Sequence, residues 1–185
     1  MLWALKQISK KEKTHGIYKE TASLSQSIKD VMRSGRNWQN MNDQQKWFES
    51  LNLNSPHQRY VIVSPDHKVI GTANLVDINW KDRNASHGLL IGDQSARGKG
   101  YAADTIMAIM RYAFEELGLN RLETTIIAYN DASLGVYMNR CGWKQEGVQR
   151  EWYFRKNRYW DRFVMGITRS EYAGLMEKNN YWNGE

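Results

Sequence analysis

The stretch "SARGKGYAADT", residues 95–105, decides the fold, because it joins a predicted strand to a predicted helix through two glycines and two basic residues. The strand is "ASHGLLIG" (85–92), and the helix runs from Lys99 to about Leu117 with its apolar residues on one stripe. Glycines before a helix let the backbone approach a ligand, and the free N–H groups with the helix dipole favour phosphate. The stretch therefore indicates either a phosphate-binding loop or an ordinary glycine-rich turn.

The rest of the chain alternates between strand and helix patterns, which indicates an α/β protein. Gly118 and Gly142 stand where predicted helices end. A hairpin is predicted over residues 142–167, with its turn near Lys156-Asn157. The other expected strands cover 59–64, 69–80 and 121–129, separated by a turn at 65–68, and the other expected helices cover 23–34, 42–53 and 131–141. The last residues, 177–185, are predicted to be a frayed tail.

Composition limits the class of protein. A chain of 185 residues with 41% hydrophobic residues is expected to fold as one domain. It has no run of about 18 apolar residues, and the apolar run near its N-terminus is too short for a signal peptide. One cysteine, Cys141, excludes an internal disulfide and fits a reducing cytoplasm. The net charge of +6 suits either solubility or an anionic partner.

Three phosphate-binding patterns can be compared with the opening stretch. The P-loop pattern is absent. Gly98-x-Gly100-x-x-Ala103 fits a loose dinucleotide-binding fingerprint, but that fold needs an acidic residue at the end of the next strand, and Glu123 lies at its start. The third pattern, Arg97-x-x-Gly100-x-Ala102, resembles a known coenzyme A pyrophosphate loop, which reads Gln/Arg-x-x-Gly-x-Gly/Ala.

This third pattern continues along the chain, and residues 59–172 resemble the GNAT superfamily of N-acetyltransferases. The segment "NDASLGVYMNRCGWKQEG" (130–147) is similar to a family signature, with Trp143 in place of a Phe. The closing hairpin "NRYWDRFVMGITRSEY" (157–172) resembles the branch that contains ribosomal-protein, polyamine and nucleotide-sugar N-acetyltransferases. The resemblance implies one domain over 1–185, with a mixed, largely antiparallel twisted sheet, helices on both faces and a tail at 173–185.

The resemblance also implies a site for acetyl-CoA as cosubstrate. The sheet is expected to splay where the pantetheine arm enters. Tyr137 would protonate the departing thiolate; by helical spacing alone it would be a core residue. The implied coenzyme-binding residues are Leu89, Leu90, Ile91, Arg97, Gly98, Lys99, Gly100, Tyr101, Ala102, Ala103, Asn130 and Ser133. Asn130 and Ser133 are in addition good residues for starting a helix.

The general base is open. Ser86 stands where the resemblance predicts a Glu, so deprotonation of the amine would run through water or through His87. Successive strand residues point to opposite faces, so Ser86 and His87 cannot both face the substrate without a bulge. A structural histidine is the alternative interpretation of His87, and Asp77 and Glu151 are further candidates.

These observations predict an enzyme that moves an acetyl group from acetyl-CoA to a primary amine. A net charge of +6 makes the chain a poor host for a polycation. A small anionic acceptor such as a nucleotide-linked amino sugar therefore ranks first, and a protein N-terminus or a polyamine are the alternatives. The basic residues that would suit such an acceptor are Arg150, Arg155, Lys156, Arg158 and Arg162.

Non-enzymatic alternatives remain at this stage. The hairpin "EWYFRKNRYWDR" (151–162) interleaves aromatic and basic residues, as nucleic-acid readers do, although it leaves the Arg97 loop and Tyr137 unexplained. A coenzyme A sensor without acetyl release is the other alternative. No metal and no membrane are expected as partners, and a homodimer is compatible with the sequence. The four histidines stand apart in sequence: His15, His57, His67 and His87.

Overall fold

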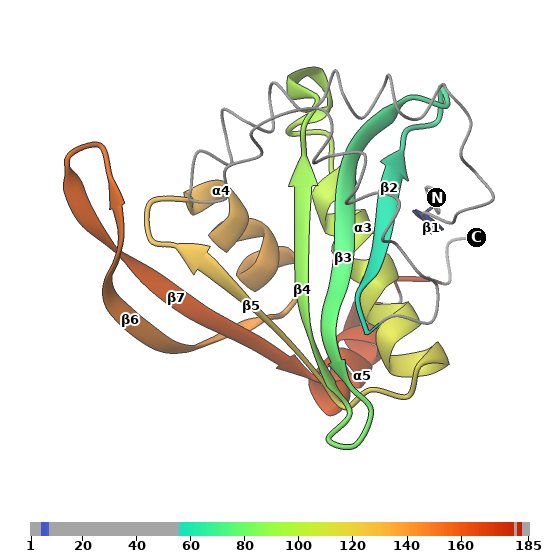
Figure 1. Ribbon diagram of the computed structural model, residues 1–185. Coiled ribbons are helices and arrows are strands. Elements are labelled where there is room, and N and C mark those ends of the chain that lie inside the picture. Colours follow the sequence, from blue (N-terminus) through green and yellow to red (C-terminus); the bar gives the residue numbers. More distant parts are fainter. Residues whose placement is uncertain (1–4, 8–55, 180, 183–185) are drawn as a thin grey trace.

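The computed structural model describes residues 5–7, 56–179 and 181–182. These residues form one seven-stranded sheet in the order β1-β2-β3-β4-β5-β7-β6 (Figure 1). Only β4 and β5 run parallel, so the mixed, largely antiparallel sheet is confirmed. The strands are β1 (Leu5–Gln7), β2 (Gln58–Val63), β3 (Val69–Asn79), β4 (Asn84–Ile91), β5 (Arg121–Ile127), β6 (Lys144–Arg155) and β7 (Arg158–Thr168).

Two of the helices contain a wider turn that the sequence did not predict. Helix α3 (Tyr101–Arg111) continues as a π-helical turn, Tyr112–Glu116, and α4 (Asp131–Leu134) continues as another, Gly135–Arg140. In each case the closing N–H donates to the carbonyl five residues back. The predicted helices at 99–117 and 131–141 are therefore present, but an i, i+4 pattern of apolar residues does not distinguish the wider turns.

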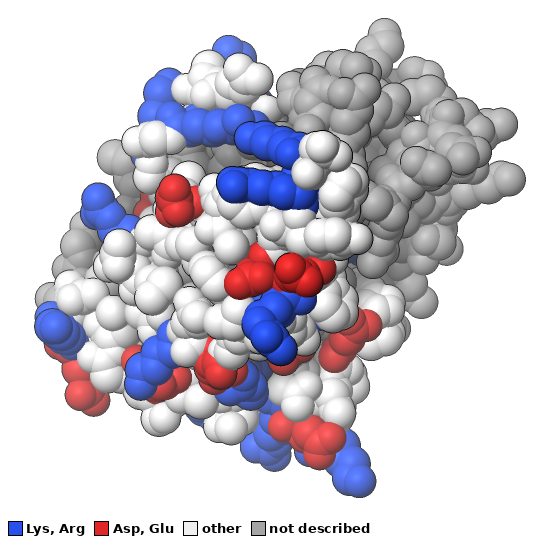
Figure 2. Space-filling model, turned by 90° about the vertical axis from the view of Figure 1, so that its left-hand side faces the viewer, with Lys and Arg blue, Asp and Glu red and all other residues white. Residues whose placement is uncertain are grey.

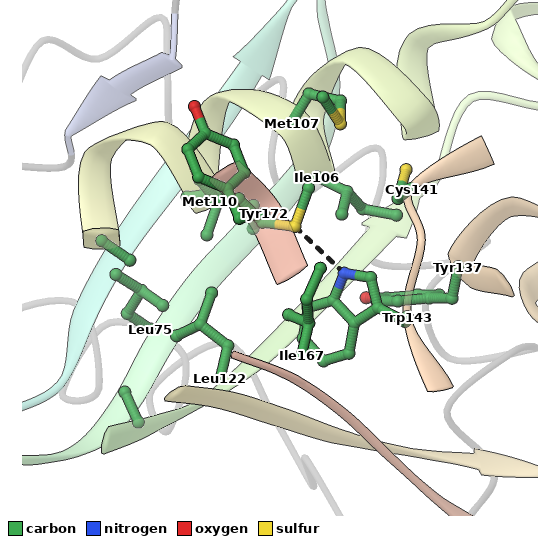
Figure 3. Packing of buried hydrophobic residues seen from close by; sticks show 14 of the residues in the cluster. Leu75, Ile106, Met107, Met110, Leu122, Tyr137, Cys141, Trp143, Ile167 and Tyr172 are labelled. Carbon is green, nitrogen blue, oxygen red and sulfur yellow. Dashed lines mark hydrogen bonds between the residues drawn. The ribbon is translucent and has the colours of Figure 1, made fainter. Parts of the chain in front are cut away.

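The described helices pack on one face of the sheet, around Trp143 (Figure 3). The indole N–H of Trp143 donates to the sulfur of Met110 on α3 at 3.2 Å. The ring of Tyr137 meets the indole edge-on, with the centroids 5.0 Å apart. Strand residues such as Leu122 and Ile167 complete the cluster. The helices predicted over 23–34 and 42–53 lie outside the described residues.

The sheet opens between its two parallel strands. β4 and β5 pair only over Asn84–Ser86 and Arg121–Glu123. Beyond that point β4 stays on β3 as far as Ile91, whereas β5 stays on β7 as far as Ile127. Figure 1 shows the two strands diverging from their shared end. The expected splay is therefore present, and it begins directly after the Ser86–Glu123 pair.

The predicted hairpin is formed by β6 and β7 and extends away from the body of the molecule (Figure 1). Its two turn residues, Lys156 and Asn157, have φ of 52° and 56°, the left-handed conformation of a two-residue hairpin turn. The register shifts between Gln149 and Tyr153, which is a bulge in β6.

The tail that the sequence predicts at 173–185 does not begin at residue 173, because residues 173–179 are helical. Residues Arg169–Asn179 form helix α5, and two aromatic residues beyond it lie against α3. The Trp182 indole donates to the Tyr172 hydroxyl at 3.3 Å, and that hydroxyl donates to Glu115 at 2.7 Å. The segment is polar and has little helical periodicity, so the sequence pattern does not predict a helix here. Single aromatic contacts hold the segment in place, and such contacts leave no periodic pattern in the sequence.

We expect Trp182→Ala to lower the free energy of unfolding by about 1–2 kcal/mol, since it removes one hydrogen bond and the partly buried ring beneath Arg111. The matched control is Trp80→Ala, because Trp80 is 55% exposed and should cost no more than about 0.5 kcal/mol. Denaturant unfolding of both variants measures the difference. Equal losses of unfolding free energy in the two variants would mean that the contacts of Trp182 do not stabilise the fold.

Candidate active site

The glycine-rich loop lies between the end of β4 and the start of α3. It begins with a short 3-10 turn, Gln94–Ala96, and the Arg97 guanidinium donates to the carbonyl of Ile91 at 3.2 Å. Gly98 and Gly100 have φ of 76° and 90°, where side chains are strained, and Gly100 is the residue that caps α3. The loop therefore turns the chain from the end of β4 into the first turn of α3.

The space beside these glycines is open. A Cβ added at Gly98 or Gly100 would meet no atom within 4 Å. Arg97 and Lys99 are exposed in the same loop, and Tyr101, Ala102 and Ala103 begin the helix. Exposed N–H groups at a helix start, next to two cations, form a setting that favours an anionic group.

The start of α4 lies past the end of β5. The Asn130 side chain accepts a hydrogen bond from the Ser133 backbone N–H at 3.2 Å, which caps the helix. The helix-starting role predicted for Asn130 is therefore confirmed. Contact of either residue with a coenzyme stays a prediction.

Tyr137 lies on the helix side of the sheet, beside the point where β4 and β5 diverge. It is 5% exposed and hydrogen-bonds Thr124 of β5. Burial raises the pKa of the Tyr137 phenol well above its ordinary value. The hydroxyl therefore keeps its proton at neutral pH, which a proton donor requires.

His87 is buried on the same side as Tyr137, with the ring centroids 6.0 Å apart. Its Nδ1 lies 2.9 Å from the carbonyl of Asn74, and since a carbonyl only accepts, Nδ1 carries the hydrogen. Nε2 is then an acceptor, and among the described residues it has no partner. Burial lowers the pKa of His87 to about 4, so its ring is neutral at physiological pH.

Ser86 and Glu123 occupy the opposite face of the same two strands. The Ser86 hydroxyl donates to the Glu123 carboxylate at 3.1 Å. Sequence reasoning weighed Glu123 only as a dinucleotide-binding acid and did not consider it at this site. The missing signal was the register of β4 against β5, which places Ser86 and Glu123 side by side.

The other two candidate bases lie elsewhere. Asp77 is in an irregular part of β3, where its backbone N–H donates to His57 at 3.2 Å. Glu151 is in the bulge of β6, and its N–H donates to Asp161 at 2.9 Å. Neither residue belongs to the strand pair at the splay.

The hairpin of β6 and β7 carries all five of the predicted basic acceptor residues. Figure 2 shows Lys and Arg side chains gathered on the upper part of the side that faces the viewer. The Arg158 guanidinium lies 3.5 Å from the Trp160 ring centre, and the Arg162 guanidinium lies 3.6 Å from that of Trp152. These cations stack on aromatic rings of the hairpin itself.

The described residues show neither a metal centre nor a membrane-spanning helix. They contain no group of three or more His, Cys, Asp or Glu side chains arranged to hold a metal ion. No helix within the described ranges is long and apolar enough to cross a membrane.

Comparisons with known proteins agree on one family. Residues 18–144 match the family model described as "Acetyltransferase (GNAT) domain". The chain is 28% identical over 131 residues to the SPbeta prophage-derived uncharacterized N-acetyltransferase YokL of Bacillus subtilis, covering 71% of this chain and 72% of that protein. It is 29% identical over 120 residues to the spermidine N(1)-acetyltransferase of Vibrio cholerae, covering 65% of this chain and 68% of that protein.

Solved structures show the same fold. A crystal structure of spermidine N-acetyltransferase from Vibrio cholerae in complex with CoA and spermine matches with a TM-score of 0.80 and 22% identity, covering 93% of this chain and 98% of that chain. A dodecameric structure of the Vibrio cholerae enzyme in an intermediate state matches with a TM-score of 0.78 and 21% identity, covering 94% and 98%.

We expect Gly100→Val to weaken acetyl-CoA binding at least about tenfold, or 1.4 kcal/mol, because the branched side chain would fill the open space beside the loop. Gly118→Val is the matched control, since Gly118 also has a positive φ and open surroundings but lies at the other end of the helix. Calorimetric titration measures both affinities. An unchanged affinity for acetyl-CoA in folded Gly100→Val would show that the loop does not contribute to the binding site.

We expect the buried His87 to make stability depend on pH. Its pKa is about 4 in the folded protein and 6.5 ordinarily, so below pH 6.5 only the unfolded chain takes up the proton. The contribution of the neutral His87 to the free energy of unfolding is fully present above pH 6.5. As the pH drops to 4, the free energy of unfolding falls by on the order of 3 kcal/mol.

The test is unfolding at pH 7 and pH 4.5. His87→Phe should lack this part of the pH dependence. His67→Asn, which changes an exposed histidine, should keep it. Identical pH dependence in the parent and His87→Phe would contradict the burial of a neutral His87.

Proposed function

The chain belongs to the GNAT family and is an acetyl-CoA-dependent N-acetyltransferase, and from this premise we propose that its acceptor is a primary amine of a small polyamine such as spermidine. The expectation of an enzyme is thereby confirmed. The identity of the acceptor is what we propose. The groups on the two faces of β4 and β5, where these strands diverge, supply the chemical argument for it.

The relatives favour the polyamine alternative over the anionic amino sugar that the sequence ranks first. The named relatives from Vibrio cholerae and Escherichia coli are spermidine N(1)-acetyltransferases, at 29% and 26% identity. The net charge of the whole chain does not decide the acceptor, because charge acts locally. Cations of the hairpin stack on their own aromatic rings, whereas the splay carries the carboxylate of Glu123.

For the coenzyme, we propose that the pantetheine arm adds to the edge of β4 that β5 leaves free. This edge runs through Leu89, Leu90 and Ile91. The pyrophosphate would bind the N–H groups of the loop and of the first turn of α3. Contributions are expected from Arg97, Gly98, Lys99, Gly100, Tyr101, Ala102 and Ala103, and from Asn130 and Ser133 on the far side.

The observation that carries the proposal is the place of Tyr137 beside the divergence of β4 and β5. An amine attacks the thioester carbonyl, the C–N bond forms, and the C–S bond breaks with its electron pair going to sulfur. The thiolate leaves more readily when it receives a proton. Tyr137 holds that proton at neutral pH, and its hydrogen bond to Thr124 fixes the hydroxyl beside β5.

The acceptor is tested by measuring thiol release from acetyl-CoA with a panel of amines. We expect kcat/KM for spermidine to exceed that for a nucleotide-linked amino sugar and for a peptide N-terminus by at least about tenfold, or 1.4 kcal/mol of transition-state binding. A higher kcat/KM for the amino sugar than for spermidine would contradict the proposal and favour an anionic acceptor. Coenzyme binding without thiol release for every amine would indicate a sensor.

We expect Tyr137→Phe to lower turnover by about 10² or more, since it keeps the ring but removes the proton donor. Tyr172→Phe is the control, because it removes another hydroxyl with a raised pKa, one that bonds Glu115 away from the splay. The control should lose about 1 kcal/mol of stability and keep its turnover. Turnover of Tyr137→Phe within about threefold of the parent would contradict the acid role.

A further inference from the structure

Glu123 lies in the last residue pair that joins the two parallel strands. Its register partner across β4 is Ser86, whose hydroxyl donates to the carboxylate at 3.1 Å. Beyond this pair, β4 and β5 no longer pair with each other. The Glu123 carboxylate is therefore held at the apex of the splay, and its side chain is exposed.

The carboxylate lies on the side of the sheet opposite Tyr137. Successive strand residues point to opposite faces, and Thr124, the residue after Glu123, bonds Tyr137. An amine adds to the carbonyl carbon of a thioester and the thiolate then leaves from the same carbon, so the attacking nitrogen and the departing sulfur exchange protons at separate positions. The two faces of the apex thus offer a proton donor for the leaving group and a carboxylate for the attacking group.

The attacking amine needs a proton acceptor. An aliphatic amine has a pKa near that of lysine, about 10.4, so at neutral pH it is an ammonium without a lone pair. His87 is a weak acceptor for this step, since its pKa is about 4 and it is buried on the side of Tyr137. Glu123 places an exposed carboxylate on the opposite side of the same strand pair.

The charged residues around Glu123 in the described ranges form their ion pairs with other residues, although Arg121 also attracts the Glu123 carboxylate electrostatically. Arg121, two residues earlier on β5, is paired through both guanidinium nitrogens with Glu146 of β6, which raises the pKa of the arginine and lowers that of the carboxyl. Glu171 of α5 is paired with Lys144 at 2.6 Å. The partner of Glu123 on β7 is Gly166, which has no side chain. Within the described ranges Glu123 itself forms no ion pair.

We propose that Glu123 accepts the proton which the acceptor ammonium loses before attack, and that Ser86 holds the carboxylate at the apex. The freed lone pair forms the C–N bond, the C–S bond breaks, and Tyr137 gives its proton to sulfur. The second nitrogen proton then returns through water to the Tyr137 oxygen, and Glu123 releases its proton to solvent. The assignment rests on the acetyl transfer proposed above, but not on which amine accepts the group.

The test compares Glu123→Gln with the parent across pH 7 to 10, using acetyl-CoA and spermidine. At pH 7 we expect turnover to fall by about 10², within the range of a positioned proton acceptor. The deficit should shrink severalfold toward pH 10, where the amine loses its proton to water without help. Glu116→Gln, which makes the same charge change at an exposed position in the π-helical turn after α3, should match the parent at every pH.

A deficit that stays constant from pH 7 to 10 would overturn the proposal, because a binding or structural role does not depend on the protonation of the amine. Turnover equal to the parent would overturn it as well. If the parent does not use spermidine, the proposed acceptor fails, and the same comparison is made with whichever amine of the panel the parent acetylates.

A second variant exchanges the register partners, Ser86→Glu with Glu123→Ser. It returns a carboxylate to the apex from the other strand, so we expect turnover at pH 7 at least about tenfold above that of Glu123→Gln. A folded exchange variant that binds acetyl-CoA normally but is no faster than Glu123→Gln would contradict the requirement for a carboxylate at this apex.

Discussion

The three-residue parallel pairing of β4 with β5 is the constraint on which the rest of the structure depends. Parallel neighbours need a crossover connection, and here the crossover consists of the glycine-rich loop and α3. The crossover must start where β4 ends, so the loop and the helix N-terminus lie beside the open end of the splay. Because the pairing stops after Ser86 and Glu123, the edge of β4 beyond them is free of β5.

The packing of the helix face keeps this opening in shape and sets the protonation of the groups beside it. Trp143 packs against Tyr137 and bonds Met110, so α3 and the turn that carries Tyr137 share one core (Figure 3). Burial in that core keeps Tyr137 protonated and His87 neutral. The buried Nε2 of His87, which has no partner among the described residues, costs free energy of about 1–3 kcal/mol. The opposite face carries the exposed carboxylate of Glu123.

Much of the fold could be predicted from the sequence, because periodicity and glycines report local structure directly. The strand–loop–helix unit around Gly100 and the hairpin turn at Lys156-Asn157 were predicted in this way, whereas the splay was implied by the resemblance to the GNAT superfamily. The helix α5 was missed, since its anchoring depends on distant contacts of Tyr172 and Trp182. Glu123 was not considered for the site for a similar reason, because only strand register brings it to Ser86. Net charge favours an anionic acceptor whereas the relatives favour a polyamine, and composition does not record where charges lie.

We propose that the coenzyme occupies the free edge of β4, between a proton donor on one face and a carboxylate on the other. Amide hydrogen exchange of the full chain, measured with and without coenzyme A, tests this placement, because an added strand or a bound phosphate protects backbone N–H groups. We expect slower exchange at residues 87–91 of β4 and at 98–103 of the loop and α3, with the hairpin tip at 155–158 unchanged. Protection confined to the hairpin, with β4 exchanging as before, would contradict it.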